Sequence, residues 1–484
     1  MVAIDPASDP VLSAAEVAAW ARDPSRPFPT PWGPREHERV AGAHATLERI
    51  STTGTVYGLT TGVGALRHVE VVADERTAVG HALRLWRSHA AGVGAEYDDA
   101  TARAVMLIRL HQLTRGGAGV SPALVEGLAT ALRQGAIPRL HEVGGIGTGD
   151  LTVLAELGLT LAGHLPWRAD AGVPPVDVAA TDALPFLSSN AATAAVATLA
   201  LADLRRFEDT LAEIAALSHR ALRGSLEAYD PRVFAARRDP WASRVAARLL
   251  ALLEDAGPAA RVQDPFGLRT VPQVHGPLVA AHAALADALD AEIDAATENP
   301  LVVDDERLHH GQFATQRLAV CLDGLRSAWV PALTLSVARL GALLDSRLTD
   351  LPDFLADGPA GSSGLMILEY VAADLLARAR PLARPVTDGR TVVSLGLEES
   401  ASHATQAALA GRDLVGLVPH LLACEVVAAV RALRLAPERA PAPGTHGARL
   451  LAEVEQVVPD VRSDHVLGPE IEATAAVIAT YAGD

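Results

Sequence analysis

The sequence of 484 residues contains no lysine, because all 41 of its basic residues are arginines. Without a lysine the chain has no side-chain amine for a Schiff base with a carbonyl substrate or with pyridoxal phosphate. It also has no lysine for a P-loop or for a protein-kinase site. The sequence therefore excludes pyridoxal-phosphate (PLP) enzymes, Schiff-base aldolases, P-loop nucleotide-binding proteins and kinases.

Cysteine and aromatic residues are also scarce. The two cysteines, Cys321 and Cys424, stand in apolar stretches and are too few for a disulfide framework, so we expect them to be buried. Aromatic residues make up 4% of the chain and hydrophobic residues 49%, which predicts a large core built from Ala, Leu and Val. The net charge of −17 disfavours a nucleic-acid partner, which needs clustered basic residues.

Segments for export, membrane insertion or metal binding are not evident. The N-terminus has no basic region followed by an apolar run, so no signal peptide is visible. The longest uncharged stretch, residues 183–202, contains Pro185, Ser188 and Asn190 and is too polar for a membrane span. His309-His310 has no partner at metal spacing. We therefore expect a soluble, cytoplasmic protein without a metal site or a membrane partner.

Apolar residues recur at helical spacing through most of the chain. The segments are too long for strands, and they are rich in alanine, the best helix former. They cover residues 192–217, 275–297, 312–344, 363–379 and 403–435. We predict an all-α fold built on a bundle of long helices, with an N-terminal domain at 1–190, a central bundle at 191–436 and a C-terminal helical segment at 437–484.

Two glycine-rich segments do not fit a helical core. Residues 57–64 combine three glycines with Tyr57, which is typical of a surface turn or of a mobile loop that carries a polar tip. Residues 144–151 hold four glycines directly before a helical stretch. A phosphate-binding loop has a similar pattern, but it needs a preceding strand, and residues 137–140 make a poor one. Glycines there could instead allow backbone contacts that other residues cannot reach.

Two charged segments are also irregular. Arg269 ends the run Gln263-Asp264-Pro265-Phe266-Gly267-Leu268-Arg269, where it could clamp a substrate carboxylate or form an ordinary loop salt bridge. Glu398 and Glu399 stand together amid neutral residues between helices, and a solvated surface is the default interpretation of such a pair.

In this order along the chain, the irregular segments resemble motifs of the histidine and aromatic amino acid ammonia-lyase family. Residues 57–64 are similar to its Tyr-Gly-x-Asn-Thr-Gly-Phe-Gly loop, and residues 88–94 to its Ser-His-Ala-x-Gly-Val-Gly segment. Residues 263–269 are similar to its Gln-Asp-x-Tyr-x-Leu-Arg signature, and residues 298–301 to its Asp-Asn-Pro-Leu. The resemblance covers roughly residues 35–435 and implies a homotetramer of long helices with each site assembled from several subunits.

The resemblance also implies a cofactor made from the chain itself. In the family, Ala-Ser-Gly cyclises and loses two waters to give a methylidene-imidazolone (MIO) electrophile. The matching residues here are Gly147-Thr148-Gly149. Thr148 has the β-hydroxyl that dehydration needs, but the product would carry an additional methyl group that hinders attack. Both outcomes, an imidazolone of this altered kind and none at all, stay open.

Other family roles carry over position by position. Tyr57 matches the base that removes the β-proton, Arg269 the clamp for the substrate carboxylate, and Glu398 an acid that contacts the amine or an imidazole. Asn190 matches an Asn that touches substrate and cofactor, and Phe266 stands where the family has a catalytic Tyr. The positions that match the substrate pocket are His89, Gln312 and Phe313.

Three hypotheses follow from these observations. The first is an ammonia-lyase or aminomutase that acts on histidine or an aromatic L-amino acid through an imidazolone. The second is an enzyme of the same fold that works on an amino-acid-like substrate without the imidazolone, and the third is a non-catalytic helical binding protein. Tyr57, Arg269 and Glu398 favour the first, whereas Thr148 and Phe266 oppose it.

Overall fold

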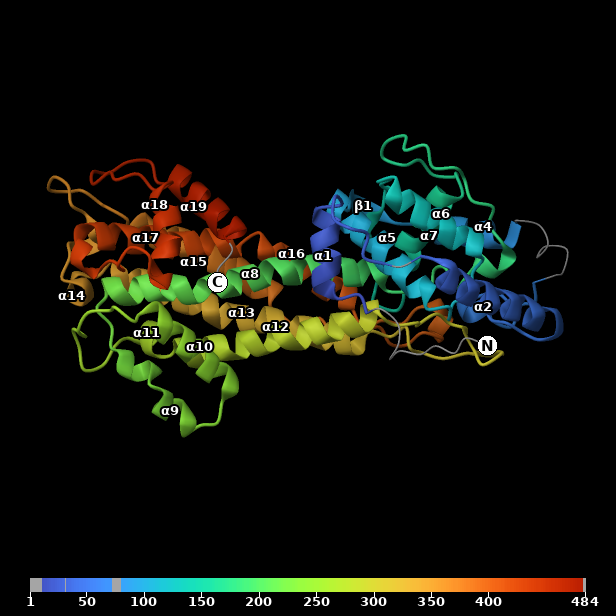
Figure 1. Ribbon diagram of the computed structural model, residues 1–484, viewed down its shortest axis with the longest axis horizontal. Helices are drawn as coiled ribbons and strands as arrows, with labels where there is room; N and C mark the ends of the chain where they lie inside the picture. Colours follow the sequence, from blue (N-terminus) through green and yellow to red (C-terminus); the bar gives the residue numbers. More distant parts are fainter. Residues whose placement is uncertain (1–10, 31, 72–79, 482–484) are drawn as a thin grey trace. The chain divides into compact units, whose positions relative to one another are not determined.

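A computed structural model describes residues 11–30, 32–71 and 80–481 (Figure 1). The described chain is mostly helical, which confirms the all-α prediction. It forms two compact units that are discontinuous in sequence. The first unit comprises residues 1–199, 285–322 and 385–409, and the second comprises residues 200–284, 323–384 and 410–484. The domain boundaries expected at residues 190 and 436 stay a prediction.

Short and medium helices around α5 make up most of the first unit (Figure 1). Its helices are α1 (Ala14–Arg22), α2 (Pro34–Thr53), α4 (Gly80–His89), α5 (Asp99–Thr114), α6 (Pro122–Arg133) and α7 (Leu151–Leu161). Strand β1 (Val93–Glu96) pairs antiparallel with β2 (His141–Val143), and β3 (Leu301–Val303) pairs with β4 (Glu306–Leu308). Three 3₁₀ turns are η1 (Gly64–Leu66), η2 (Ala180–Asp182) and η5 (Ser394–Gly396).

Helix α17 (Val418–Leu435) lies in the core of the second unit, where it packs on α15 (Ile367–Leu382) and α19 (Gly468–Thr480). The other helices of this unit are α9 (Pro231–Ala235), α10 (Pro240–Leu252), α11 (Phe266–Arg269), α14 (Ser346–Thr349) and α18 (Arg449–Glu455). Its 3₁₀ turns are η3 (Leu226–Tyr229), η4 (Asp353–Leu355), η6 (Pro437–Arg439) and η7 (His446–Ala448).

Four helices have residues in both units. They are α8 (Ala191–Ala221), α12 (Val271–Ile293), α13 (Gln316–Leu343) and α16 (Ala404–Val415). These helices and α17 fall on segments in which the apolar spacing predicts helices. Helix α12 begins shortly after the irregular segment 263–269, and α16 begins shortly after Glu398 and Glu399.

Helix boundaries follow the local sequence. Ser13 begins α1 with a capping box, in which its side chain accepts from the amide of Glu16 and the Glu16 carboxylate accepts from the amide of Ser13. The side chain of Asp98 caps α5 by accepting from the amide of Thr101, and Ser121 caps α6 directly before Pro122, which is well suited to a first helical turn. These caps satisfy backbone N–H groups that the helices cannot pair internally.

Each unit contains a fully buried ion pair. In the first, a guanidinium nitrogen of Arg109 lies 2.7 Å from the Glu298 carboxylate, and both side chains are inaccessible to solvent. In the second, Arg339 on α13 bonds the Glu425 carboxylate on α17 at 2.6 Å, again without solvent exposure. Cys424 beside it is buried as expected, whereas Cys321 is only partly buried.

By length and hydropathy alone, two described stretches could cross a membrane. They are Gln316–Leu343, with a mean hydropathy of 1.3, and Ala404–Leu435, with 1.8. However, 50% of the first apolar window and 72% of the second are buried inside the protein. Core helices of a bundle have this composition too, so the two stretches are weak evidence for a membrane span.

Candidate active site

The loop that carries Gly147, Thr148 and Gly149 connects β2 to α7 in the first unit. Gly147 has a φ of +77° and Gly149 a φ of +102°, values that disfavour any residue with a side chain. A Cβ atom on Gly147 would lie 2.1 Å from the hydroxyl oxygen of Ser402. The glycines therefore allow a tight bend in contact with neighbouring segments, as one interpretation of the sequence expected.

Two buried hydroxyl groups bind the carbonyl of Gly147. The Ser402 hydroxyl donates to this oxygen at 2.8 Å and the Thr315 hydroxyl donates to it at 3.1 Å. Both side chains belong to residues that are only 3% exposed, and their oxygens lie 2.9 Å apart. The carbonyl is thus polarised from two sides in a site that water does not reach.

Asn190 holds the other end of the loop. Its side-chain oxygen accepts a hydrogen bond from the amide of Gly149 at 3.0 Å, and its side-chain nitrogen donates to the carbonyl of Phe313 at 2.7 Å. Asn190 is fully buried directly before α8. The structure therefore brings three predicted site residues together, namely Gly149, Asn190 and Phe313.

Two acidic side chains lie next to this loop. Burial raises the pKa of Asp150 to about 6, although the amide and hydroxyl of Thr193 donate to its carboxylate. Burial and, secondly, the charge of Asp150 raise the pKa of Glu292 to about 7, while Asn190 lowers it through a hydrogen bond. Glu292 Oε1 is buried without a hydrogen-bond partner. A carboxyl group that titrates near neutral pH in such surroundings is typical of functional sites.

Tyr57 lies in the loop before η1, and its side chain is partly buried. Its hydroxyl accepts a hydrogen bond from the amide of Gly64 at 2.6 Å. Burial raises the pKa of Tyr57, the bond from Gly64 lowers it, and the negative charge of Glu398 raises it. The predicted base and the predicted acid thus interact electrostatically across a loop contact.

Two segments connect the tyrosine loop to the glycine loop. In residues 309–315, His309 accepts from the amide of Tyr57 at 3.3 Å, and Thr315 reaches the carbonyl of Gly147. In residues 394–403, the Ser394 hydroxyl accepts from the amide of Ala65 at 2.8 Å, and the amide of His403 donates to the carbonyl of Ile146 at 2.9 Å. Each segment therefore contacts both loops, so the tyrosine loop and the glycine loop share two neighbouring segments in the first unit.

The predicted pocket residues of this unit lie on two different segments. His89 ends α4, where its Nδ1 lies 2.8 Å from the carbonyl oxygen of Leu85. The chain continues from His89 into β1, which pairs with β2 at the start of the glycine loop. Gln312 and Glu398 are exposed, and Phe313 is partly buried. No described contact joins the His89 or Gln312 side chains to the Gly-Thr-Gly segment.

Arg269 and Phe266 lie on α11, which belongs to the second unit. The guanidinium carbon of Arg269 lies 4.5 Å from the centre of the Phe266 ring, which is 64% exposed. The Arg269 guanidinium group has no ion pair or hydrogen bond with the described residues, and its Nε is buried without a partner. An unpaired arginine on an exposed aromatic ring is available to an external carboxylate.

Buried polar groups position α11. Arg339 donates to the carbonyl of Gly267 at 3.2 Å, and the hydroxyl of Tyr229 donates to the carbonyl of Leu268 at 3.0 Å. Asp264 pairs with Arg261 at 2.9 Å and accepts from the amide of Ser225 at 2.6 Å. Within the predicted motif, Asp264 is therefore paired with neighbouring residues, whereas the Arg269 guanidinium group is not.

Sequence reasoning missed Ser402, Thr315 and Glu292. The two hydroxyl residues lie 87 positions apart, and their shared contact with Gly147 leaves no local pattern. Glu292 is the next-to-last residue of α12, and an acidic residue near a helix end is usually exposed to solvent. Its nearness to the Asn-Pro motif at 299–300 was the one available signal.

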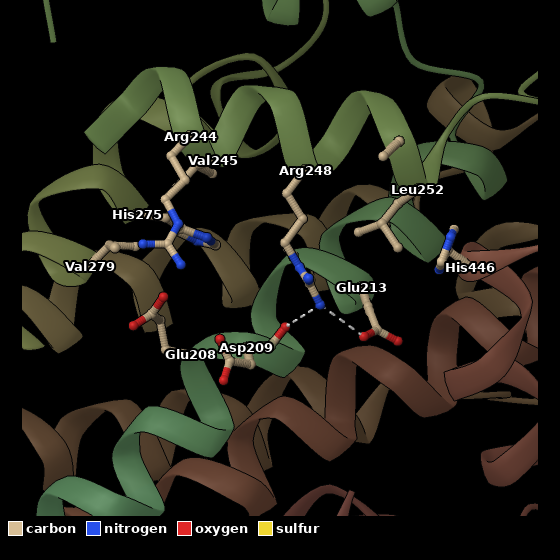
Figure 2. Close-up of a pocket in the computed structure, with 12 residues that line it drawn as sticks. Glu208, Asp209, Glu213, Arg244, Val245, Arg248, Leu252, His275, Val279 and His446 are labelled. Atoms are coloured by element: carbon tan, nitrogen blue, oxygen red, sulfur yellow. Dashed lines mark hydrogen bonds and ion pairs between the residues drawn. The ribbon is translucent and has the colours of Figure 1, made fainter. Parts of the chain in front are cut away.

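A cavity of about 390 Å³ in the second unit contains none of the predicted site residues. Figure 2 shows Glu208, Asp209 and Glu213 on α8 across from Arg244 and Arg248 on α10. Arg248 donates to Glu213 at 3.2 Å. An ion pair thus joins the two helices that line the cavity, and we assign this cavity no part in the site. Among residues 11–30, 32–71 and 80–481, no group of three or more His, Cys, Asp or Glu side chains could hold a metal ion.

Comparison with known proteins gives a consistent result. Residues 12–456 match the aromatic amino acid lyase family model. The histidine ammonia-lyase of Symbiobacterium thermophilum is 34% identical, over 96% of this chain and 95% of that protein. The one of Geobacillus thermodenitrificans is 31% identical, over 91% and 90%. The structure of the phenylalanine aminomutase of Pantoea agglomerans superposes with a TM-score of 0.91 at 24% identity, over 97% and 98%, which shows the same fold.

Proposed function

Because the chain belongs to the aromatic amino acid lyase family, we propose that it eliminates ammonia from histidine or an aromatic L-amino acid. The observation that carries the proposal is the pair of segments, 309–315 and 394–403, that connect the Tyr57 loop to the Gly-Thr-Gly loop. These shared neighbours support a site in which Tyr57 acts as the base and the Gly-Thr-Gly backbone supplies the electrophile.

Tyr57 acts as the base in this proposal. Its phenolate accepts the β-proton of the substrate, and the amide of Gly64 stabilises this phenolate by donating a hydrogen bond to its oxygen. Because burial and Glu398 raise its pKa, Tyr57 is protonated in most molecules at neutral pH. Elimination should therefore accelerate as the pH rises toward the pKa of Tyr57.

Arg269 binds the substrate carboxylate. Its guanidinium group stacks on Phe266 and has no described internal partner, so it can form a bidentate pair with a carboxylate. We further propose that the chain is a cytoplasmic homotetramer in which several subunits contribute to each site. The exposure of Phe266 supports an assembly that covers this part of α11.

The residues around Gly147, Thr148 and Gly149 fit an imidazolone. The carbonyl of Gly147 accepts two hydroxyl hydrogen bonds, and the amide of Gly149 is held by Asn190. Thr148 has no hydrogen bond with the described residues, so no such bond has to break before its hydroxyl group is lost. When formed, the group would supply the electrophile that makes the amino group a better leaving group. His89, Gln312 and Phe313 would line the side-chain pocket.

A second candidate function is elimination or amino-group transfer in the same fold without an imidazolone. It is favoured by Thr148, whose dehydration leaves a hindered electrophile, and by Phe266, which has no hydroxyl for proton transfer. In this alternative Tyr57 and Arg269 retain their roles, and the Gly-Thr-Gly loop stays chemically unmodified. The match to histidine ammonia-lyases over most of the chain disfavours a purely binding protein.

Two substitutions test the proposed roles. Replacing Arg269→Met should raise KM about 10- to 100-fold, because a charge-assisted carboxylate pair is worth roughly 1.5–3 kcal/mol. Replacing Tyr57→Phe should lower kcat about 10²- to 10⁴-fold, which is the usual contribution of a general base. The assay measures ammonia release from L-histidine, L-phenylalanine and L-tyrosine.

Matched controls are Arg378→Met and Tyr370→Phe, whose side chains are on the surface of the second unit. Both controls should retain wild-type kinetics. If Arg269→Met and Tyr57→Phe gave equal and mild effects, these residues would not form the site.

A further inference from the structure

Two side-chain hydroxyl groups donate hydrogen bonds to the backbone carbonyl of Gly147. Its oxygen and the hydroxyl oxygens of Ser402 and Thr315 form a triangle with sides of 2.8, 3.1 and 2.9 Å. The Ser402 oxygen also accepts from the amide of Ala404 at 3.2 Å, so its own proton remains for donation. We infer that Ser402 and Thr315 form an oxyanion hole for cyclisation of the Gly147-Thr148-Gly149 loop.

The inference rests on the proposed function and assigns residues that catalyse formation of its electrophile. Ring closure begins when the amide nitrogen of Gly149 bonds the carbonyl carbon of Gly147, and the electron pair of the C=O bond moves onto the oxygen. Hydroxyl donors preplaced on that oxygen stabilise the charge as it develops. They stabilise the amide starting state less, because it carries only a partial charge.

The reaction balances as the loss of two waters. The first water takes the oxygen of Gly147 with the amide protons of Gly149 and Thr148, and leaves a C=N bond. The second takes the hydroxyl and the α-proton of Thr148, and leaves a C=C bond. No oxidant or second reactant is needed. The paired hydroxyls can also pass a proton to the departing oxygen of Gly147, since they are in contact with it and with each other.

The surroundings hold the two hydroxyls in place. Thr315 directly precedes α13, and its carbonyl accepts from the amide of Ala319 at 3.0 Å. Ser402 lies two residues before α16. The hydroxyls thus approach Gly147 from the N-terminal ends of two helices, where partial positive charge favours a developing anion.

Gly147 itself completes the arrangement. The oxygen of Ser402 occupies the space that a side chain on Gly147 would need, because a Cβ there would lie 2.1 Å from it and 2.7 Å from the amide of Ala404. The glycine in this position therefore leaves room for a hydroxyl at its own carbonyl. Asn190 completes the site by accepting the Gly149 amide proton in a hydrogen bond, which places the nucleophilic nitrogen.

The test follows maturation by mass, independently of enzyme activity. Freshly synthesised full-length protein is sampled over time, and the mass of the peptide that contains residues 144–150 is measured by mass spectrometry. Wild type should lose two waters. Thr315→Val and Ser402→Ala should each slow the loss about 10²- to 10³-fold, as does removal of one oxyanion-hole donor. Thr315→Ser keeps a hydroxyl and should mature nearly as fast as wild type.

A matched control is Thr160→Val, which removes a buried hydroxyl that bonds a helix carbonyl within α7 at 2.8 Å. It should mature at the wild-type rate. If Thr315→Val and Ser402→Ala also matured at that rate, the oxyanion hole would be refuted while the proposed imidazolone remained. If folded wild type lost no water, the imidazolone itself would be refuted and the inference with it. Circular dichroism of each variant verifies folding, and Thr315→Ser preserves the test if Thr315→Val fails to fold.

Discussion

The ion pair between Arg109 and Glu298 should be a major determinant of stability in the first unit. Arg109 also donates to the carbonyls of Pro185 and Phe186, at 2.7 and 3.1 Å, in the segment that leads to Asn190. Burial lowers the pKa of Arg109, and the charge of Glu298 opposes this. Replacing Arg109→Met removes the charge and these bonds but keeps much of the apolar volume.

The expected cost is about 3–5 kcal/mol in the free energy of unfolding. The substitution leaves the Glu298 carboxylate buried, with one oxygen already unpartnered and the other deprived of its 2.7 Å bond. Two carbonyl groups also lose their donors. Because a buried charge without a partner is the main penalty, the double variant Arg109→Met with Glu298→Leu should recover at least half of the loss.

The assay is equilibrium unfolding in urea, followed by circular dichroism. A matched control is Arg133→Met, which breaks an exposed ion pair with Glu126 in the same unit, at 3.4 Å and with both side chains about half exposed. It should cost less than about 1 kcal/mol. A loss for Arg109→Met as small as for the control, or no recovery in the double variant, would refute the reasoning.

Three further predictions concern the site. Glu398→Gln removes a charge that raises the pKa of Tyr57, so the alkaline rise of kcat/KM should shift to lower pH in a pH–rate profile. Glu292→Gln should stabilise the protein by roughly 2 kcal/mol above pH 7 and by little near pH 4.5. The reason is that a carboxyl group whose pKa is raised from 4.5 to about 7 in the folded protein lowers the free energy of unfolding as the pH rises through this range. Urea unfolding at both pH values measures the difference. Gly147→Ala should lower the melting temperature more than Gly172→Ala, because both have positive φ but only Gly147 has close neighbours.

The helices could be predicted from the sequence because their cause is local. Alanine-rich segments with apolar residues at helical spacing form α8, α12, α13, α16 and α17, and the caps of α1, α5 and α6 are readable from single residues. The loops at 57–64 and 144–150 were also identifiable, since glycine disrupts that pattern. Their chemical meaning came from the resemblance to a family.

Contacts between distant residues could not be predicted. Glu298 stood in a recognisable motif, yet nothing in that motif says that it pairs with Arg109, 189 positions away. Ser402 and Thr315 are ordinary small polar residues until the fold places both hydroxyls on one carbonyl. The pKa of Glu292 likewise depends on burial and on Asp150, which only the folded chain brings close.

The most direct test of the proposed function is product analysis of the native enzyme with L-histidine, L-phenylalanine and L-tyrosine. Ammonia and the α,β-unsaturated acid are quantified together, with Tyr57→Phe as the inactive reference. We expect at least one of these amino acids to yield the two products in equal amounts, and we expect Tyr57→Phe to abolish most of both. Neither product from any of the three, or equal yields from Tyr57→Phe, would contradict it.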